Sequence, residues 1–446
     1  MEKGTVTQYD DEFNGVIINE KGIAISVPGA LVGEEIHYHI EHISPHAPKG
    51  WGRCDGLLNN ISPDRVKPPC GVAWPVAGGC SGCPLMHVSD ALEQKLKTQF
   101  VLNALQKAGV NYIHSLSFHS PAGTLNYRNR TDLVAAERGG RLVLGSYKPR
   151  SHDVIVTTFC PILRMPLNSI IKQVVRAAND LRIPACKPVV QISGALRYVS
   201  LFANENREVL VDLVCKSAAG YPPVWLESFA KRLMAFSPVR GVSYSLNDSP
   251  NNAIRVAPSQ TICGVSRLTE HHGSTASLFS ASGFTQLNTE IAAKIYQSAR
   301  EWANMRANVV WDLYCGAGAF GRTFAPAKSL YGAEFSESAI EAARLVSQND
   351  PFDTHFEVMD LEKVWPQWPE PDVVLVDPPR KGLSTNVIRH LLAMKPPAIF
   401  YMSCSPETFA QNVSALSESY VLERIEGFNM MPQTRHIELL GLLRKR

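Results

Sequence analysis

The feature that most constrains the fold is a regular alternation of short apolar strands and helices from about residue 284 to residue 446. The strand predicted at 372–376 holds a continuous apolar run, Val-Val-Leu-Val. Such runs are typical of a parallel sheet that helices cover on both faces. Ligands of these sheets bind beyond the carboxyl ends of the strands, where the strand order reverses. The alternation therefore predicts a Rossmann-like domain over residues 276–446, with a ligand site at one edge of its sheet.

The other elements expected in this domain follow the same alternation. The predicted helices lie at 288–302, 319–325, 338–348, 385–394 and 406–417, and the remaining predicted strands at 309–315, 329–335, 355–359, 398–404, 420–428 and 436–444.

The rest of the chain is long enough for further domains, since 446 residues exceed one ordinary domain. Residues 1–62 carry short apolar strands separated by Gly and Pro, which is typical of a small β-barrel. Residues 63–275 mix the two patterns and are expected to form an α+β central domain. The whole chain is thus predicted to be a multidomain α/β protein. In the central domain we expect helices at 89–109, 166–181 and 224–236, and strands at 142–144, 197–203 and 209–214.

Composition excludes few functions, but it bears on the cellular compartment and on the kinds of partner. The formal net charge is +3, so bulk charge argues neither for nor against a nucleic-acid partner. No apolar run approaches the ~18 residues of a membrane span, and the polar N-terminus lacks the apolar segment of a secretory signal. We therefore expect a cytoplasmic protein with no membrane partner. Disulfides are not expected there, so metal or catalytic roles become more plausible for the ten cysteines.

The sequence does not identify any protein partner, so protein partners stay unknown at this point.

A glycine-rich turn predicts a nucleotide-like cofactor. Gly316, Gly318 and Gly321 spell G-x-G-x-x-G between a strand and a helix, and Glu334 closes the next strand, where an acid can bind ribose hydroxyls. A dinucleotide dehydrogenase and a tight turn without ligand are the alternatives. The early acid and the sequence Asp377-Pro-Pro at the end of the fourth strand favour S-adenosylmethionine.

A thiol and a carboxylate are predicted at the same sheet edge. Cys404 ends one apolar strand, and Glu438 lies in the last one. Carbon 5 of uracil is a poor nucleophile, but a thiolate added at carbon 6 makes carbon 5 reactive toward a methyl donor. A base must then remove the carbon 5 proton. Cys404 and Glu438 are candidates for these two roles, whereas a buried structural cysteine and a solvated acid are the alternatives.

Residues 284–446 resemble the RNA 5-methyluridine methyltransferase family, whose catalytic domain is a class I S-adenosylmethionine-dependent sheet. The resemblance is carried by Phe284-Thr-Gln-Leu-Asn288, Leu313-Tyr-Cys-Gly-Ala-Gly318, Asp377-Pro-Pro-Arg-Lys-Gly382, Ser403-Cys-Ser-Pro406 and Pro432-Gln-Thr-Arg-His-Ile-Glu438. It implies that Cys404 is the nucleophile and Glu438 the base. It also implies a set of S-adenosylmethionine ligands, of which Asp360 is the weakest match: Gln286, Tyr314, Glu334, Asp360 and Asp377. Ala319 and Ser405 depart from the family pattern, which has Asn at both positions.

A cysteine cluster predicts a metal centre. Cys80-Ser-Gly-Cys83, with Cys70 upstream, offers three thiolates on irregular backbone, and Cys160 is a distant fourth. Four thiolates can hold zinc or an iron–sulfur cluster. The pattern is similar to that of the ribosomal members of the same family, which implies a [4Fe–4S] cluster, with zinc as the alternative.

RNA is the expected partner. Basic residues gather between Tyr127 and Arg150, with aromatic residues interleaved, as suits phosphates and unstacked bases; a solvated strand face is the alternative. Residues 1–62 resemble the TRAM domain, an RNA-binding barrel. Barrel and cluster together favour large-subunit (23S) ribosomal RNA over transfer RNA. A methyltransferase acting on another atom and a non-catalytic RNA-binding iron–sulfur protein stay open, although neither needs both Cys404 and Glu438.

Overall fold

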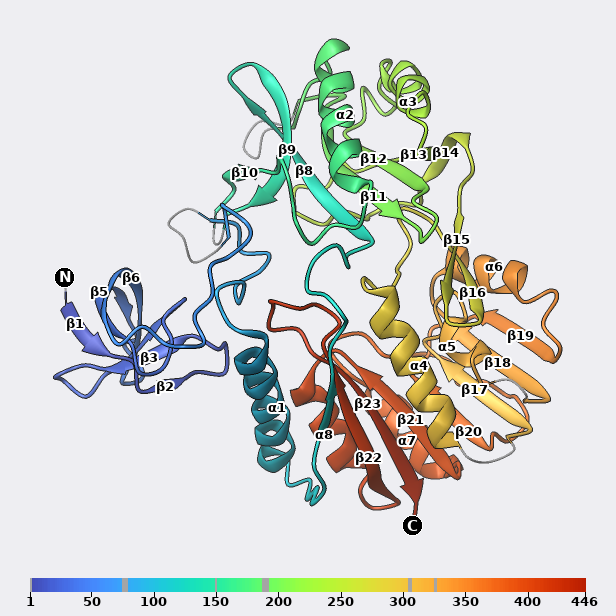
Figure 1. Ribbon diagram of the computed structural model, residues 1–446. Helices are drawn as coiled ribbons and strands as arrows, with labels where there is room; N and C mark the ends of the chain where they lie inside the picture. Colours follow the sequence, from blue (N-terminus) through green and yellow to red (C-terminus); the bar gives the residue numbers. More distant parts are fainter. Residues whose placement is uncertain (1, 74–78, 149–150, 187–191, 304–306, 325–326) are drawn as a thin grey trace. The chain divides into compact units, whose positions relative to one another are not determined.

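Figure 1 shows the computed structural model of the chain, which describes residues 2–73, 79–148, 151–186, 192–303, 307–324 and 327–446. Contacts divide the chain into two compact units. The first combines Met1–Ala104, Lys148–Ser151 and Met431–Ile437, and the second combines Leu105–Tyr147, His152–Met430 and Glu438–Arg446. The three-domain division expected from the sequence therefore stays a prediction.

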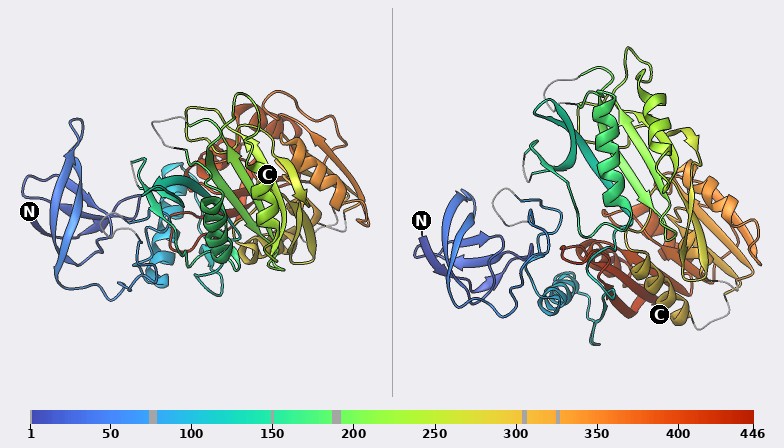
Figure 2. Two further views of the ribbon diagram at one scale, coloured as in Figure 1. Left: turned by 90° about the horizontal axis from the view of Figure 1, so that it is seen from above. Right: turned by 45° about the horizontal axis from the view of Figure 1, so that its top comes forward.

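The first unit contains a curved, mostly antiparallel sheet near the N-terminus. Its strands are β1 (Glu2–Thr5), β2 (Gln8–Tyr9), β3 (Gly15–Ile18), β4 (Ala24–Val27), β5 (Glu35–Ile43) and β6 (Lys49–Asn59). They are ordered β1-β5-β6-β4-β3-β2, with β4 and β6 parallel, and Figure 2 shows them curling around a shared interior. Ile17, Ile25, Ile36 and Tyr38 fill that interior. Buried and accessible side chains alternate along β4 and the first part of β5, so one face of each strand lines the interior of the barrel.

A buried carboxylate on helix α1 (Asp90–Lys107) joins two distant segments of the first unit. The helix carries Glu93 and Lys97, whose side chains are 1% and 0% exposed and lie 2.7 Å apart. Both carboxylate oxygens of Glu93 accept from the backbone N–H of Gln433, at 2.9 and 3.0 Å. Leu85 donates its backbone N–H to the carbonyl of Gln433. The segment 431–437 is therefore held in this unit by a charge that water cannot reach.

The central sheet of the second unit has seven strands. These are β8 (Arg130–Arg138), β9 (Arg141–Tyr147), β10 (Val154–Val156), β11 (Leu196–Ala203), β12 (Val209–Cys215), β13 (Val239–Leu246) and β14 (Gln260–Gly264), in the order β10-β9-β8-β11-β12-β13-β14. Helices α2 (Leu167–Asp180) and α3 (Leu226–Met234) pack their apolar faces on one side of this sheet. Hairpin β15 (Leu268–His272) and β16 (Thr275–Phe279) follows the central sheet in the chain.

The C-terminal sheet has the expected parallel core. Its strands are β7 (Ser117–His119), β17 (Val309–Leu313), β18 (Ser329–Glu334), β19 (Asp353–Val358), β20 (Val373–Val376), β21 (Ala398–Ser403), β22 (Tyr420–Phe428) and β23 (Glu438–Lys445). The order is β19-β18-β17-β20-β21-β23-β22-β7. Its helices are α4 (Thr289–Ala303), α5 (Ala319–Arg322), α6 (Glu337–Val346), α7 (Thr385–Met394) and α8 (Pro406–Leu416).

The strand order of this sheet reverses at β17. From β17 the chain builds outward through β18 and β19, and it then returns to add β20 and β21 on the other side. All five strands are parallel, so their carboxyl ends share one edge. Strand β23 is antiparallel to β21, with Ser403 opposite Leu439. The edge expected to bind a ligand is thus formed, and the start of β23 lies at the end of β21.

We predict that Lys97→Met destabilises the first unit by about 3–5 kcal/mol, because it leaves the buried Glu93 carboxylate without its cation. The free energy of unfolding, from urea denaturation, measures this loss. Lys3→Met is the control, because it breaks an exposed pair with Glu35 in the same unit and should cost about 1 kcal/mol or less. A loss no greater than that of the control would show that the Glu93–Lys97 pair is not essential to the unit.

Candidate active site

The loop after β17 has the backbone conformation of a cofactor turn. Tyr314, Gly316 and Gly318 have positive φ angles of 67°, 53° and 76°. Gly321 packs against Asp312 so closely that an added Cβ would lie 2.7 Å from the carboxylate Oδ2. The backbone N–H of Gly321 also donates to that oxygen at 2.8 Å. The spacing of the glycines therefore reflects turn geometry and close helix–strand packing.

The Glu334 carboxylate lies against this loop. Its Oε2 accepts from the backbone N–H of Gly316 at 3.3 Å, and its Oε1 accepts from the N–H of Ser336 at 2.8 Å. Glu334 ends β18, next to β17. It is thus held at the sheet edge where an acid was predicted to bind ribose.

Three further carboxylates gather at the same edge. Burial raises the pKa of Asp312 to about 7, with a further contribution from the charge of Glu334. Desolvation and the charge of Glu438 raise the pKa of Asp377 well above its usual range. Burial raises the pKa of Glu438 to about 8, although the Arg380 guanidinium opposes the rise. The edge therefore concentrates acidic groups that a cationic ligand would stabilise in their ionised forms.

Cys404 follows β21 beside these acids. Burial, followed by the charge of Glu438, raises the pKa of the Cys404 thiol to about 11, and Arg380 acts in the opposite direction. The thiol is therefore protonated at neutral pH in the ligand-free protein. Ser405 caps α8, because its side chain accepts from the backbone N–H of Thr408. The departure from the family residue at this position leaves a functional cap in place.

The remaining predicted cofactor ligands are Tyr314, in the glycine loop itself, Asp360 and Gln286. The Tyr314 hydroxyl is buried and lacks a hydrogen-bond partner among the described residues, and the charges of Glu362 and Asp360 add to the effect of burial in raising its pKa. Asp360 itself pairs with Lys363 at 2.9 Å on the surface. Gln286 is buried in the segment before α4. The structure thus groups Cys404, Glu438, Asp377 and the loop of Glu334, and it puts Asp360 near Tyr314.

Arg380 and Asp312 were not among the predicted site residues. The charge of Arg380 opposes the rise in the pKa of both Cys404 and Glu438, so it reaches both candidate reacting groups. It lies in the Asp377-Pro-Pro-Arg sequence, and that position was the available signal. Asp312 precedes the glycine turn, and its full burial could not be read from the sequence.

The predicted metal ligands are divided between the two units. Cys70, Cys80 and Cys83 belong to the first, and Cys160 belongs to the second. A backbone bridge pairs Ala73 with Cys80, and the N–H of Gly82 lies 3.4 Å from the Cys80 sulfur. Within the described parts of the chain, no three or more His, Cys, Asp and Glu side chains form a group able to hold a metal ion. The cluster therefore stays a prediction.

The predicted RNA-contacting region is only partly on the surface. Arg138 and Arg141 are exposed at the turn between β8 and β9. Tyr127 and Arg130 are 7% and 5% exposed, so in this conformation their side chains offer little surface to a partner. Burial lowers the pKa of Arg130 to about 10. Arg150 lies outside the described residues.

No helix in the described part of the chain is both long and apolar enough to cross a membrane.

Comparisons with known proteins relate this chain to RNA methyltransferases. The family model described as tRNA (Uracil-5-)-methyltransferase matches residues 359–446, which include Asp377, Cys404 and Glu438. An uncharacterized RNA methyltransferase of Staphylococcus aureus is 30% identical over 456 residues, covering 99% of this chain and 97% of its own. One from Halalkalibacterium halodurans is 31% identical over 438 residues, covering 95% and 92%.

A solved structure shares the fold over nearly the whole chain. The Pyrococcus abyssi tRNA (uracil-54, C5)-methyltransferase, in complex with S-adenosyl-L-homocysteine, is 24% identical with a TM-score of 0.76. The match covers 99% of this chain and 100% of that one. The curated relatives show that the chain belongs to an RNA methyltransferase family, and its residues 359–446 match the family model of the tRNA (uracil-5-)-methyltransferases.

Proposed function

We propose that this enzyme methylates carbon 5 of a uridine in structured RNA through a covalent bond between Cys404 and carbon 6 of the base. The observation that carries the proposal is the meeting of a thiol and a buried carboxylate at one sheet edge. Glu438 begins β23, Cys404 follows β21, and each lies within reach of the charge of Arg380. The target base has to leave its stack to reach this edge, which costs roughly a few kcal/mol.

The proposed reaction uses Cys404 first and Glu438 second. The Cys404 sulfur forms a bond to carbon 6, and the electron pair of the C5–C6 double bond moves toward the carbonyl at carbon 4. Carbon 5 would then take the electrophilic methyl group that S-adenosylmethionine supplies when bound, as the bond between that methyl group and the sulfonium sulfur breaks and S-adenosylhomocysteine is left. Glu438 removes the proton from carbon 5, the C5–C6 double bond forms again, and the Cys404 thiolate leaves.

The pKa of Glu438 suits a base, whereas the pKa of Cys404 has to fall before the thiol attacks. Cys404, with a pKa of about 11, has to lose its proton before it attacks, and Arg380 stabilises the resulting thiolate. Glu438, with a pKa of about 8, is a base matched to the neutral range, because its conjugate acid is neither too strong nor too weak. A carboxylate with an ordinary pKa would be a poorer proton acceptor.

The cofactor ligands proposed are Gln286, Tyr314, Glu334, Asp360 and Asp377. Glu334 is held against the glycine loop by two backbone N–H groups, so its carboxylate is fixed before a ribose arrives. The Tyr314 hydroxyl, without a partner among the described residues, is a donor that a ligand can use. S-adenosylmethionine carries a sulfonium and an ammonium charge, which complement the acids at the edge.

We predict that the affinity for S-adenosylmethionine rises by about tenfold as the pH rises from about 6 to about 8. Asp312, with a pKa of about 7, and Glu438, with a pKa of about 8, attract a cation only when ionised, so a bound cation lowers both pKa values and releases protons. Calorimetry in buffers of different ionisation enthalpy measures that release. S-adenosylhomocysteine, which has no sulfonium, is the matched control, and an equal pH dependence for both ligands would contradict the electrostatic account.

We predict that Glu438→Gln traps a covalent protein–RNA adduct, because the methyl group is transferred but the carbon 5 proton stays in place. A denaturing gel with labelled RNA should show a slower band. Cys404→Ala is the control: it should form no adduct and transfer no methyl group, yet bind S-adenosylmethionine nearly as well as the wild type. Turnover by the Ala variant, or the absence of a band from the Gln variant where the wild type is active, would rule out this pair of roles.

Large-subunit (23S) ribosomal RNA is the substrate that we propose, and transfer RNA is the alternative. The cysteine pattern supports the ribosomal substrate. The similarity of fold to a transfer-RNA enzyme, over 99% of this chain, supports the alternative and weakens the argument from the N-terminal barrel. The barrel, proposed to be a TRAM domain over residues 1–62, has an RNA-binding role under either substrate.

We predict that RNA from a deletion strain lacks 5-methyluridine at one or more positions of 23S ribosomal RNA. Mass mapping of digested ribosomal and transfer RNA measures both candidates in one experiment. Complementation with the wild type should restore the modification, and the Cys404→Ala variant should not. Loss of 5-methyluridine from transfer RNA alone would establish the alternative substrate.

We also propose that Cys70, Cys80, Cys83 and Cys160 hold a [4Fe–4S] cluster. The turn at Cys80 supports this, since a backbone N–H near a ligand sulfur is one of the contacts that tune such clusters. No step of the proposed reaction passes through the cluster.

We predict that protein purified without oxygen is brown and contains iron and sulfide, because four thiolates favour a soft metal centre. Elemental analysis measures the metal content. Cys160→Ser should lose the iron, whereas Cys263→Ser, in the central sheet, should keep it. Zinc without iron in the anaerobic protein would overturn the cluster but leave the proposed methyl transfer unaffected.

A further inference from the structure

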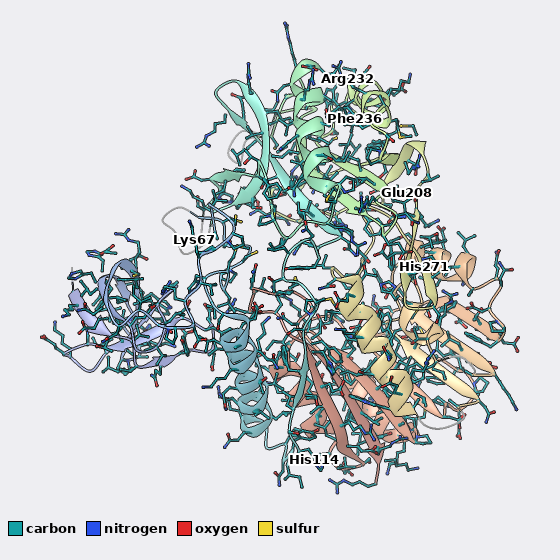
Figure 3. All side chains as sticks on the ribbon, in the orientation of Figure 1. Lys67, His114, Glu208, Arg232, Phe236 and His271 are labelled. Carbon is teal, nitrogen blue, oxygen red and sulfur yellow. The ribbon has the colours of Figure 1, made fainter. Side chains whose placement is uncertain are left out.

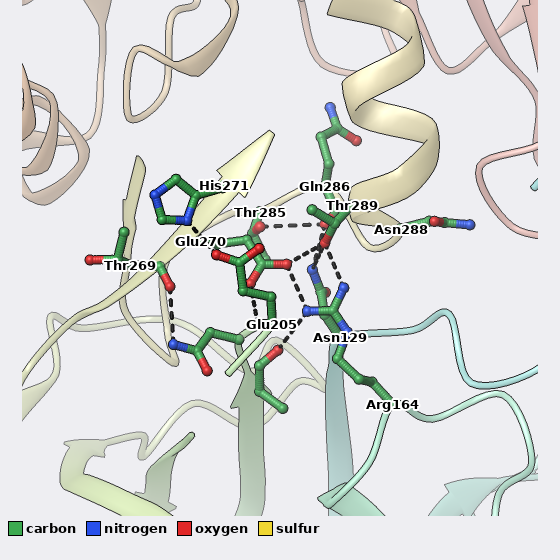
Figure 4. Close-up of polar contacts among 12 residues, drawn as sticks. Asn129, Arg164, Glu205, Thr269, Glu270, His271, Thr285, Gln286, Asn288 and Thr289 are labelled. Carbon is green, nitrogen blue, oxygen red and sulfur yellow. Dashed lines mark hydrogen bonds and ion pairs between the residues drawn. The ribbon is translucent and has the colours of Figure 1, made fainter. Parts of the chain in front are cut away.

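A buried polar network lies beside the segment that carries Gln286 (Figure 4). At its centre is Glu270 of β15, whose side chain is 0% exposed. Its Oε1 accepts from the Arg164 guanidinium at 2.6 Å and from the Thr289 hydroxyl, and its Oε2 accepts from the backbone N–H of Glu205 at 2.7 Å. Arg164 also donates to the Thr289 hydroxyl at 2.7 Å. Thr289 is the first residue of α4, so the network fixes where that helix begins.

Asn129 connects this network to Gln286. Its side-chain N–H donates to the backbone carbonyl of Gln286 at 2.9 Å, and its backbone N–H donates to the carbonyl of Leu287 at 3.0 Å. The Asn129 carbonyl accepts from the N–H of Ala203, at the end of β11. The Asn129 side chain is 0% exposed. One asparagine therefore ties the central sheet to two consecutive peptide groups around Gln286.

The path of segment 284–288 is not set by regular secondary structure. It lies between β16 and α4 and forms no helix or strand of its own. A backbone without regular structure takes its position from the side chains that satisfy its polar groups. Buried, charge-assisted hydrogen bonds are both strong and geometrically demanding, so this network can fix the path of the segment.

We propose that Asn129 is a positioning residue that, with the Arg164–Glu270–Thr289 network, holds Gln286 in the orientation that binds S-adenosylmethionine. The inference rests on the proposed role of Gln286. Asn129 acts through Gln286 and has no contact with the reacting atoms. Displacement of a binding group by about 1 Å can cost up to a hundredfold in function, so the loss of one anchoring bond should lower cofactor affinity measurably without removing the reacting groups.

The test is a double-mutant comparison of affinity for S-adenosylhomocysteine, measured by calorimetry on the full chain. Asn129→Ala should weaken binding by about tenfold. In a Gln286→Ala background the same substitution should change the affinity by less than about twofold, because the side chain that it positions is gone. A merely structural role would give the same loss in both backgrounds.

Control variants separate this effect from general destabilisation. Arg232, on α3, forms an ion pair with Asp180 at 2.6 Å and is labelled in Figure 3. Both partners are exposed, so Arg232→Gln should leave the affinity unchanged. If Asn129→Ala does not fold, Thr289→Val provides the same comparison, since it removes the hydroxyl between Glu270 and Arg164 with little change of shape.

The outcomes distinguish this inference from the proposed function. Wild-type affinity in Asn129→Ala, or an equal loss with and without the Gln286 side chain, would overturn the positioning role. If Gln286→Ala alone binds as tightly as the wild type, the proposed cofactor role of Gln286 fails, and the positioning role fails with it. A non-additive loss that leaves the melting temperature close to that of Arg232→Gln establishes the inference.

Discussion

Strand β23 runs antiparallel to β21, and this reversal brings Glu438, its first residue, beside Cys404, which follows the last residue of β21. A parallel strand at that position would carry its first residue to the opposite edge of the sheet. The pairing also leaves Glu438 away from water, which raises its pKa into the range of a useful base. The proposed chemistry thus depends on one backbone register and on the acidity that burial produces.

The negative charge of the sheet edge distinguishes S-adenosylmethionine from a dinucleotide, whereas the glycine motif alone is compatible with both. Burial raises the pKa values of Asp312 and Asp377, and the charges of Glu334 and Glu438 add to the rise at Asp377. A dinucleotide would bring a pyrophosphate, whose negative charge these groups would repel. A sulfonium cofactor brings the opposite sign. The preference for S-adenosylmethionine over a dinucleotide therefore has an electrostatic reason in addition to the sequence resemblance.

Much of the catalytic sheet could be predicted from the sequence, because buried parallel strands are continuous apolar runs and their ends are marked by polar residues. The strands ending before Asp377 and Cys404 agree with the prediction to within a residue or two. β7 could not be anticipated, since three residues carry no periodic signal and their partner β22 is some three hundred residues away. The burial of individual charged side chains could not be predicted from the sequence either. Arg130, for example, is 5% exposed, and its residue type gives no sign of that burial.

Most of the candidate site residues predicted from motifs lie at or near strand ends, whereas the residues of the Glu270 network come together through long-range contacts. Arg164, Glu270 and Thr289 come from three separate segments, and each is unremarkable in its own surroundings. Only tertiary packing makes them one network. Sequence patterns therefore identify candidates for reaction more readily than the groups that hold them in place.

The central position of β23, between β21 and β22, has a consequence for how the enzyme loses its structure. Six consecutive residues from Glu438 are buried, and strands on both sides satisfy the backbone. Amide protons of such a strand exchange with solvent only when a large cooperative part of the fold opens, whereas those of edge strands such as β7 and β19 exchange through local fraying. Deuterium uptake should therefore reach the outer strands long before it reaches the strand that carries Glu438.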